Sequence, residues 1–240
     1  MDKFRRRLPF FLLLFLFFRV VFLFSQSLAD SEIHKKYDEL VGLESAGFYN
    51  GPEFKEDYAT SSGVSRYFNQ NTFDDGIVEY NGQLFAKVPL KYDIFSDNVI
   101  TKSKDYLGNF IVRLIPEFIS KFSIDGHDFV KLTDAKLELS GNGFYEILTV
   151  GNQFNLYLKH IRKDKERTVD LSVQHSFTNQ NYYLVQYDGI FYPISSIKDF
   201  RKVVPVRYNE IQKFRKDYKF MYKANNYGFM IRLIEYLNGY

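Results

Sequence analysis

Three two-residue turns constrain the fold of this 240-residue chain most strongly. Asn81-Gly82, Asp125-Gly126 and Asp188-Gly189 each stand between stretches in which apolar and polar residues alternate. Glycine and its Asn or Asp neighbour readily adopt the positive φ angles of a type I′ turn, the connection that suits two antiparallel strands. The pattern therefore predicts β-hairpins at all three places.

Further strands are expected around these hairpins. A fourth hairpin is predicted at Gly151-Asn152, between residues 145–150 and 154–158, and single strands are predicted over 109–115 and 168–173. Eight to eleven strands joined by short turns indicate a mainly β fold of the α+β class. We expect an antiparallel sandwich or a half-open barrel with a short helical C-terminus.

After Pro193 the apolar period changes from two residues to three or four, which is typical of helices. Ser195 or Ser196 is expected to cap a helix start, and Asp199 completes a capping box if Ser196 is the cap. Pro205 ends the segment that follows. Apolar side chains then recur along one predicted helical stripe at Ile211, Phe214, Tyr218 and either Met221 or Tyr222. A last helix is expected over 229–237, ending near Asn238-Gly239.

The first 27 residues have the order of a secretory signal peptide. Basic residues precede an apolar run from Leu8 to Phe24, and Ser25-Gln26-Ser27 follows. A retained membrane anchor is the alternative, but this run contains Arg19 and is shorter than the about 20 apolar residues of a spanning helix. We expect cleavage after Ser27 or Ala29, and export to the periplasm or the outer membrane.

The domain organisation follows from these segments. Residues 1–27 are the signal peptide, and 28–75 are an N-terminal arm with a short helix, since glycines and polar residues interrupt any longer period there. Residues 76–194 form the antiparallel β domain, and the helices of 195–240 pack on that same domain.

Composition excludes several classes of function. The chain has no Cys, which rules out disulfides, thiolate zinc sites and cysteine nucleophiles. Without residues 1–27 its formal net charge is −1, so we expect no nucleic-acid partner. Charge is uneven, however, because residues 198–240 carry ten basic and four acidic side chains.

Aromatic residues are the unusual feature of the composition, with 26 Phe and 19 Tyr but no Trp. Many of them alternate in the predicted strands, where aromatic side chains commonly pack in the core. The alternative is a cavity lined by these rings, which would suit a lipid or another hydrophobic ligand.

Few residues in the sequence suggest catalysis or the binding of a metal or cofactor. Asp93 and Asp97 lie in one predicted loop, where they either bind a cation or act as acid and base, or simply cap the turn. The histidines are scattered at His34, His127, His160 and His175, without the local spacing of a metal site. Nucleophile, P-loop and dinucleotide motifs are absent, so we predict no cofactor, no metal and no enzymatic activity.

Lysines gather in the predicted C-terminal helix. Lys213, Lys216, Lys219 and Lys223 follow one another at spacings of three and four, which predicts a shared exposed face. Such a face either keeps the helix soluble or contacts an anionic membrane surface or an acidic partner protein.

Several of these motifs resemble a family of uncharacterised secreted or periplasmic proteins of Bacteroidota. The resemblance covers most of residues 48–240 and includes Tyr49-Asn50-Gly51, Gly76-x-Val78-x-Tyr80-x-Gly82, Val88-x-Leu90-x-Tyr92-Asp93 with Asp97, Gly143-Phe144-Tyr145, Gly151 and the basic helical C-terminus. The signal ending Phe24-Ser25-Gln26 is also similar. The resemblance implies an exported envelope protein, and it implies no activity or catalytic residue.

Two functions from different classes remain open at this point. The first is a non-enzymatic binding module of the cell envelope, whose partner is another envelope protein or the membrane surface. The second is a periplasmic carrier of a lipid or other hydrophobic ligand in an aromatic-lined half-open barrel. A continuous apolar cavity would favour the carrier, and a filled core would favour the binding module. A hydrolase without a recognisable motif ranks below both.

Overall fold

The computed structural model describes residues 47–56, 64–103, 110–133, 137, 141–169 and 172–240. The chain divides into two compact units, Met1–Phe48 and Tyr49–Tyr240, and the account below concerns the second. The predicted signal peptide and its cleavage sites, the helix expected in the arm, and His34 lie outside the described residues.

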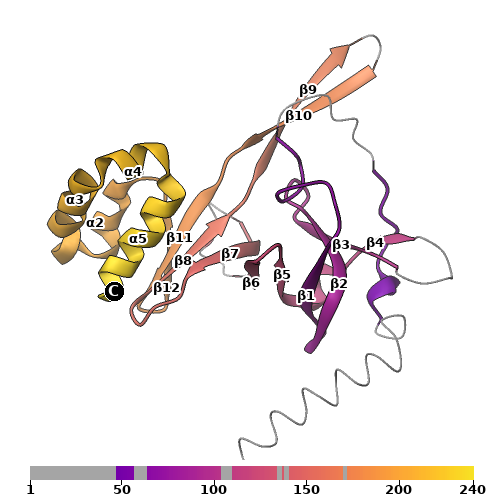
Figure 1. The fold of residues 1–240 in the computed structure, drawn as a ribbon, viewed down its shortest axis with the longest axis horizontal. Helices are drawn as coiled ribbons and strands as arrows, with labels where there is room; N and C mark the ends of the chain where they lie inside the picture. The colour runs from indigo at the N-terminus through magenta and orange to yellow at the C-terminus, as the bar shows by residue number, and fades with distance from the viewer. Residues whose placement is uncertain (1–46, 57–63, 104–109, 134–136, 138–140, 170–171) are drawn as a thin grey trace, which may run out of the picture. The chain divides into compact units, whose positions relative to one another are not determined.

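A large antiparallel sheet forms the main body of the second unit (Figure 1). Within the described residues its order is β12-β11-β8-β7-β6-β5-β1-β2-β3-β4. Its strands are β1 (Asp74–Tyr80), β2 (Gln83–Asp93), β3 (Asn98–Lys102), β4 (Ile111–Arg113), β5 (Ile119–Ile124), β6 (His127–Leu132), β7 (Gly143–Thr149), β8 (Phe154–Lys159), β11 (Tyr182–Tyr187) and β12 (Ile190–Ile194). The sheet is not closed into a barrel. The mainly β, antiparallel fold class is confirmed.

The three predicted two-residue turns are confirmed. They join β1 to β2, β5 to β6 and β11 to β12. φ is 52° at Asn81 and 51° at Asp125 and Asp188, and the three following glycines have φ between 72° and 78°. Both central residues therefore lie in the left-handed region, as a type I′ turn requires.

Two other strand predictions had different outcomes. The hairpin around residues 151–152 is present and joins β7 to β8. The single strand predicted over 168–173 is wrong, because this segment spans the end of β9 (Arg162–Val169) and the start of β10 (Ser172–Asn179). These two strands pair with each other as a separate hairpin.

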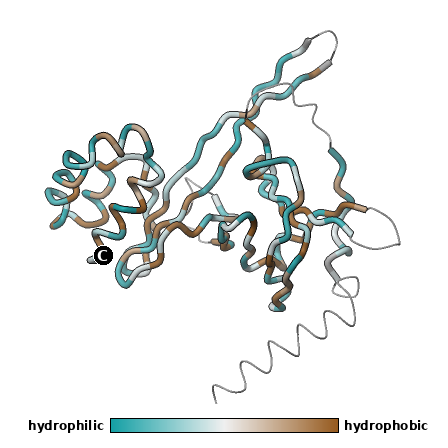
Figure 2. Tube along the Cα trace, viewed as in Figure 1, coloured by the Kyte–Doolittle hydropathy of each residue, from teal (hydrophilic) through white to brown (hydrophobic). Residues whose placement is uncertain are grey.

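The β9–β10 hairpin continues the β8–β11 pair beyond the sheet (Figure 1). Lys159 pairs with Tyr182 at the last position of the sheet, and Arg162 pairs with Asn179 at the first position of the hairpin. Figure 2 shows mostly hydrophilic residues along β9 and β10. Such a ribbon contributes little apolar surface to a core.

Short helices follow the last strand, as predicted. They are α2 (Phe200–Val203), α3 (Tyr208–Asp217), α4 (Lys219–Ala224) and α5 (Asn226–Asn238), and the 3-10 turns η4 (Ile197–Asp199) and η5 (Pro205–Arg207) precede α2 and α3. The 3-10 turns η2 (Phe48–Asn50) and η3 (Pro116–Phe118) lie earlier in the chain. The Asp199 carboxylate accepts a hydrogen bond of 2.7 Å from the backbone N–H of Ser196, which starts η4. Gly239, with φ of 89°, ends α5.

The helices cover one end of the sheet. α5 packs on β7 and β8, and the apolar stripe of α3 buries Ile211 and Phe214 in the same cluster as Leu156 and Val185 of the strands. The predicted stripe is interrupted at Tyr218, where the backbone leaves helical geometry between α3 and α4.

Aromatic rings from four strands fill the centre of the sheet face. Phe122 of β5 stacks on Phe129 of β6 with centroids 4.7 Å apart. Tyr92 of β2 meets both rings edge-on, and Phe144 of β7 meets Phe122 edge-on. Phe68, from the segment expected to be an arm, adds a further edge contact to Phe129. These rings pack against one another, which is the core arrangement expected of strand aromatics.

Candidate functional site

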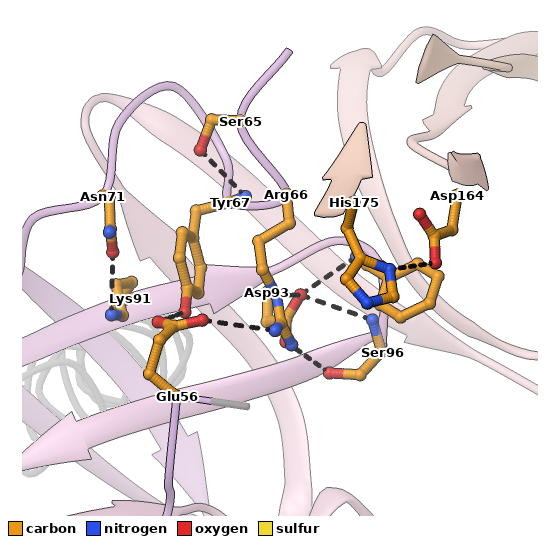
Figure 3. Close-up of polar contacts among 11 residues, drawn as sticks. Glu56, Ser65, Arg66, Tyr67, Asn71, Lys91, Asp93, Ser96, Asp164 and His175 are labelled. Atoms are coloured by element: carbon orange, nitrogen blue, oxygen red, sulfur yellow. Dashed lines mark hydrogen bonds and ion pairs between the residues drawn. The ribbon is translucent and has the colours of Figure 1, made fainter. Parts of the chain in front are cut away.

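Asp93 lies at the end of β2 and its side chain has no exposed surface. It accepts hydrogen bonds from Phe95 N at 3.1 Å and Ser96 Oγ at 2.6 Å, which are the local bonds of an aspartate that caps a turn. Arg66 also donates to both of its carboxylate oxygens, one of them from Nε at 3.2 Å (Figure 3). Asp93 is therefore held by a buried ion pair in addition to the expected turn.

Arg66 connects this carboxylate to a second acid. Its Nη1 lies 3.3 Å from Glu56 Oε1, and the Tyr67 hydroxyl donates to the other Glu56 oxygen (Figure 3). Burial is the largest single effect and lowers the pKa of Arg66, but the hydrogen bond and charge of Asp93, together with the smaller effects of Tyr67 and Glu56, outweigh burial, so the net shift is upward. The guanidinium therefore stays charged between two carboxylates.

Lys91 lies on the same strand as Asp93, two residues earlier, and is also buried. Its Nζ donates to Asn71 Oδ1 at 3.0 Å and lies 4.1 Å from the centroid of the Tyr67 ring. The ring of Phe73 is the next aromatic contact, at 4.9 Å. Burial lowers the pKa of Lys91. The ammonium is therefore stabilised by ring faces as well as by an amide oxygen.

Asp97 faces a different cation from Asp93. It accepts a hydrogen bond of 2.6 Å from the Tyr92 hydroxyl and another of 2.6 Å from Lys159 Nζ. Lys159 Nζ also donates to the Phe144 carbonyl at 3.1 Å, and burial lowers the pKa of this lysine against the opposing effect of Asp97. A Cβ on Gly143 would meet Asp97 Oδ2 at 1.9 Å, so this close approach requires glycine.

The two loop carboxylates thus do not act as one pair. Asp93 binds Arg66, Asp97 binds Lys159, and each ion pair is largely shielded from solvent. A carboxylate that is already paired and hydrogen-bonded is a poor candidate for general acid or base catalysis. The geometry supports a structural role for both residues.

A third buried acid was not singled out by the sequence patterns. Glu146 of β7 is 2% exposed and binds His127 Nδ1 at 2.5 Å, His160 Nε2 at 2.6 Å and the Tyr227 hydroxyl at 2.9 Å. Burial raises its pKa, but the bonds from His160, His127 and Tyr227 outweigh burial, and the pKa of Glu146 is lowered overall. Phe68 lies edge-on to both imidazoles.

One signal for Glu146 was available in the sequence. Phe144, Glu146 and Leu148 alternate along β7, so they share a face, and that face is apolar apart from the glutamate. A lone acid on an inward face indicates a buried partner. The partners themselves come from β6, from the segment after β8 and from α5, which no local pattern could join.

The lysines predicted to share one face of a helix lie on two short helices, α3 and α4, which are separated at Tyr218. Lys213 and Lys216 belong to α3, Lys219 and Lys223 belong to α4, and all four are exposed. Within the described residues, none of the four takes part in a salt bridge. Phe220 lies among them in sequence and is 86% exposed. We call these five residues the Lys–Phe220 surface.

The three comparisons with known proteins identify no relative of this chain. No protein-family model matches the chain, and no curated protein or solved structure is significantly similar to it. None of the helices in the described ranges has the length and apolar composition that crossing a membrane requires.

Proposed function

We propose that the chain is an exported, non-enzymatic protein of the bacterial cell envelope that binds an anionic membrane surface through the Lys–Phe220 surface. The observation that carries this proposal is the exposure of Phe220 among four exposed lysines. Phe220 lies on α4 together with Lys219 and Lys223, and an exposed apolar ring on a basic helix suits the boundary between anionic headgroups and acyl chains. The resemblance to exported proteins and the signal-like N-terminus support the location.

The charges of this region give the expected strength of binding. Residues 198–240 carry a net charge of +6, and Lys213, Lys216, Lys219 and Lys223 are four of the ten basic side chains of this segment. A lysine near an anionic bilayer contributes about 1 kcal/mol, so four contribute up to about 4 kcal/mol, or roughly a thousandfold in partitioning. Because salt screens exposed charges, binding should weaken as ionic strength rises.

The carrier alternative has less support. It needs a cavity lined by aromatic residues, whereas the rings of Tyr92, Phe122, Phe129 and Phe144 contact one another. Ring-to-ring contact favours a filled core in this part of the sheet and thus the binding module.

Co-sedimentation with vesicles tests the proposal. We expect the protein to sediment with vesicles that contain phosphatidylglycerol, weakly with phosphatidylcholine alone, and less in high salt. Replacing Lys213, Lys216, Lys219 and Lys223 by Gln should abolish sedimentation with the anionic vesicles.

A charge-matched control carries four other exposed lysines as Gln: Lys55, Lys121, Lys163 and Lys165. This control loses the same number of positive charges as the first variant but keeps the Lys–Phe220 surface, so it should still bind. Equal loss in both variants would show that net charge alone governs binding and would contradict the assignment to this surface. Failure of the unmodified protein to bind any anionic vesicle would contradict the membrane proposal, and binding to an acidic envelope protein instead would identify a different partner.

A further inference from the structure

The β9–β10 hairpin brings two acids and a histidine to one face. Asp164 and Glu166 are two residues apart on β9, so their side chains project to the same side. His175 of β10 pairs directly with Glu166 across the hairpin. Three side chains that commonly bind metals therefore meet on one face of the ribbon.

The distances suit one cation. His175 Nδ1 lies 2.7 Å from Asp164 Oδ2, and one ligand atom from each of the three residues lies within 4.8 Å of the others (Figure 3 shows His175 and Asp164). Ligands bound to zinc at about 2.1 Å are themselves roughly 3 to 4 Å apart. Small side-chain movements would convert the existing contact into coordination.

A second observation points to a missing partner. Asp164 Oδ1 is buried, and it has no hydrogen-bond partner within the part of the chain that the structure describes. A buried carboxylate oxygen without a partner is costly and rare. The cross-strand contact with His175 satisfies Oδ2 only and leaves Oδ1 unexplained.

Within the described β9 strand, no basic side chain is known to bind these two acids. Lys163, Lys165 and Arg167 alternate with the two acids along β9 and so project to the opposite side of the ribbon. Arg162 shares the face of Asp164, but its Nε donates to the Ser65 carbonyl at 2.8 Å. The negative charge of the two acids is therefore available to a bound cation.

We propose that Asp164, Glu166 and His175 bind one divalent transition-metal ion of the zinc type. Two carboxylates and one imidazole are a mixed oxygen and nitrogen ligand set, which suits Zn²⁺ better than an all-oxygen ion such as Ca²⁺. Three protein ligands leave a coordination position for water or for a group of a partner. This site is separate from the Lys–Phe220 surface and does not depend on the proposed membrane binding.

Calorimetric titration of the EDTA-dialysed, tag-free protein with Zn²⁺ tests the proposal. We expect one ion per chain in the unmodified protein and at least tenfold weaker binding in Glu166→Gln. Glu166 is exposed, so its replacement leaves the fold intact, which circular dichroism would verify. His175→Gln should also lose the ion.

Glu235→Gln is the matched control, since it removes one exposed carboxylate on α5, outside the hairpin. It should bind Zn²⁺ like the unmodified protein. Equal affinity of Glu166→Gln and the unmodified protein would overturn the site, and so would the absence of saturable binding by a folded, unmodified chain.

Discussion

Glu146 shows how single residues hold this fold together. Its carboxylate lies in an apolar strand and joins His127 of β6, His160 after β8 and Tyr227 of α5. Removing one member of a buried hydrogen-bonded group leaves the others without partners, at a cost of about 1–3 kcal/mol each. Asp93 with Arg66, and Asp97 with Lys159, follow the same principle elsewhere in the sheet.

The lowered pKa of Glu146 predicts how stability depends on pH. A carboxyl group whose pKa is lower in the folded state adds stability above its ordinary pKa of 4.5, and this contribution is lost as the pH falls through the lowered value. We therefore expect Glu146→Gln to be about 1–3 kcal/mol less stable than the unmodified protein at pH 7. The difference should shrink below about pH 4.5.

Urea denaturation at a series of pH values measures this difference. Glu117→Gln, an exposed glutamate in η3, is the control and should be neutral throughout. A Glu146→Gln variant that is as stable as the unmodified protein at pH 7 would show that the buried network adds nothing to the fold.

Among the elements, α5 not only packs on β7 and β8 but is also hydrogen-bonded to the loop between them through Asn238. Asn238 Oδ1 accepts hydrogen bonds from Gln153 N at 3.1 Å and Phe154 N at 2.9 Å, and its Nδ2 donates to the Phe154 carbonyl at 3.0 Å. The amide therefore satisfies backbone groups of the loop that otherwise need water.

Asn238→Ala tests this connection. We expect a loss of about 1–3 kcal/mol in the free energy of unfolding, because up to three hydrogen bonds are removed. Thermal or urea denaturation measures it, and Asn152→Ala, an exposed residue of the same loop, should change stability little. Equal effects of the two substitutions would mean that the loop, and not its contact with α5, determines stability.

Local elements and the hairpin pairing of adjacent strands were predictable from the sequence, but the pairing of strands distant in the sequence was not. The type I′ turns depend on two adjacent residues such as Asn81 and Gly82, and the end of α5 depends on Gly239, so short patterns were sufficient. The position of β1 between β5 and β2 depends on contacts between distant residues. The Glu146 network combines three parts of the sheet region with a helix. The sequence shows only that Glu146 alternates with apolar residues along its strand, and it does not show which residues bind it.

At the scale of the whole molecule, the first prediction concerns export. Residues 1–27 have the charge and apolar pattern of a signal peptide, so we expect the mature protein to begin at Leu28 or Asp30. N-terminal sequencing of protein recovered from the envelope fraction measures this directly. An intact residue 1–29 segment in the mature protein would instead support a retained anchor.

Docking at a membrane should bury Phe220, and the chain offers a clean probe because it contains no Trp. In a Phe220→Trp variant, the single indole would enter the interface between headgroups and acyl chains, where tryptophan is favoured. Leu84→Trp is the matched control, since Leu84 is a 55% exposed apolar residue on β2, away from the helices.

Tryptophan fluorescence with phosphatidylglycerol-containing vesicles is the measurement that tests the membrane proposal most directly. We predict a shift to shorter wavelength and quenching by brominated lipids at position 220, weakened by high salt, with neither change at position 84. An unchanged spectrum at position 220, or equal changes at both positions, would contradict binding through the Lys–Phe220 surface.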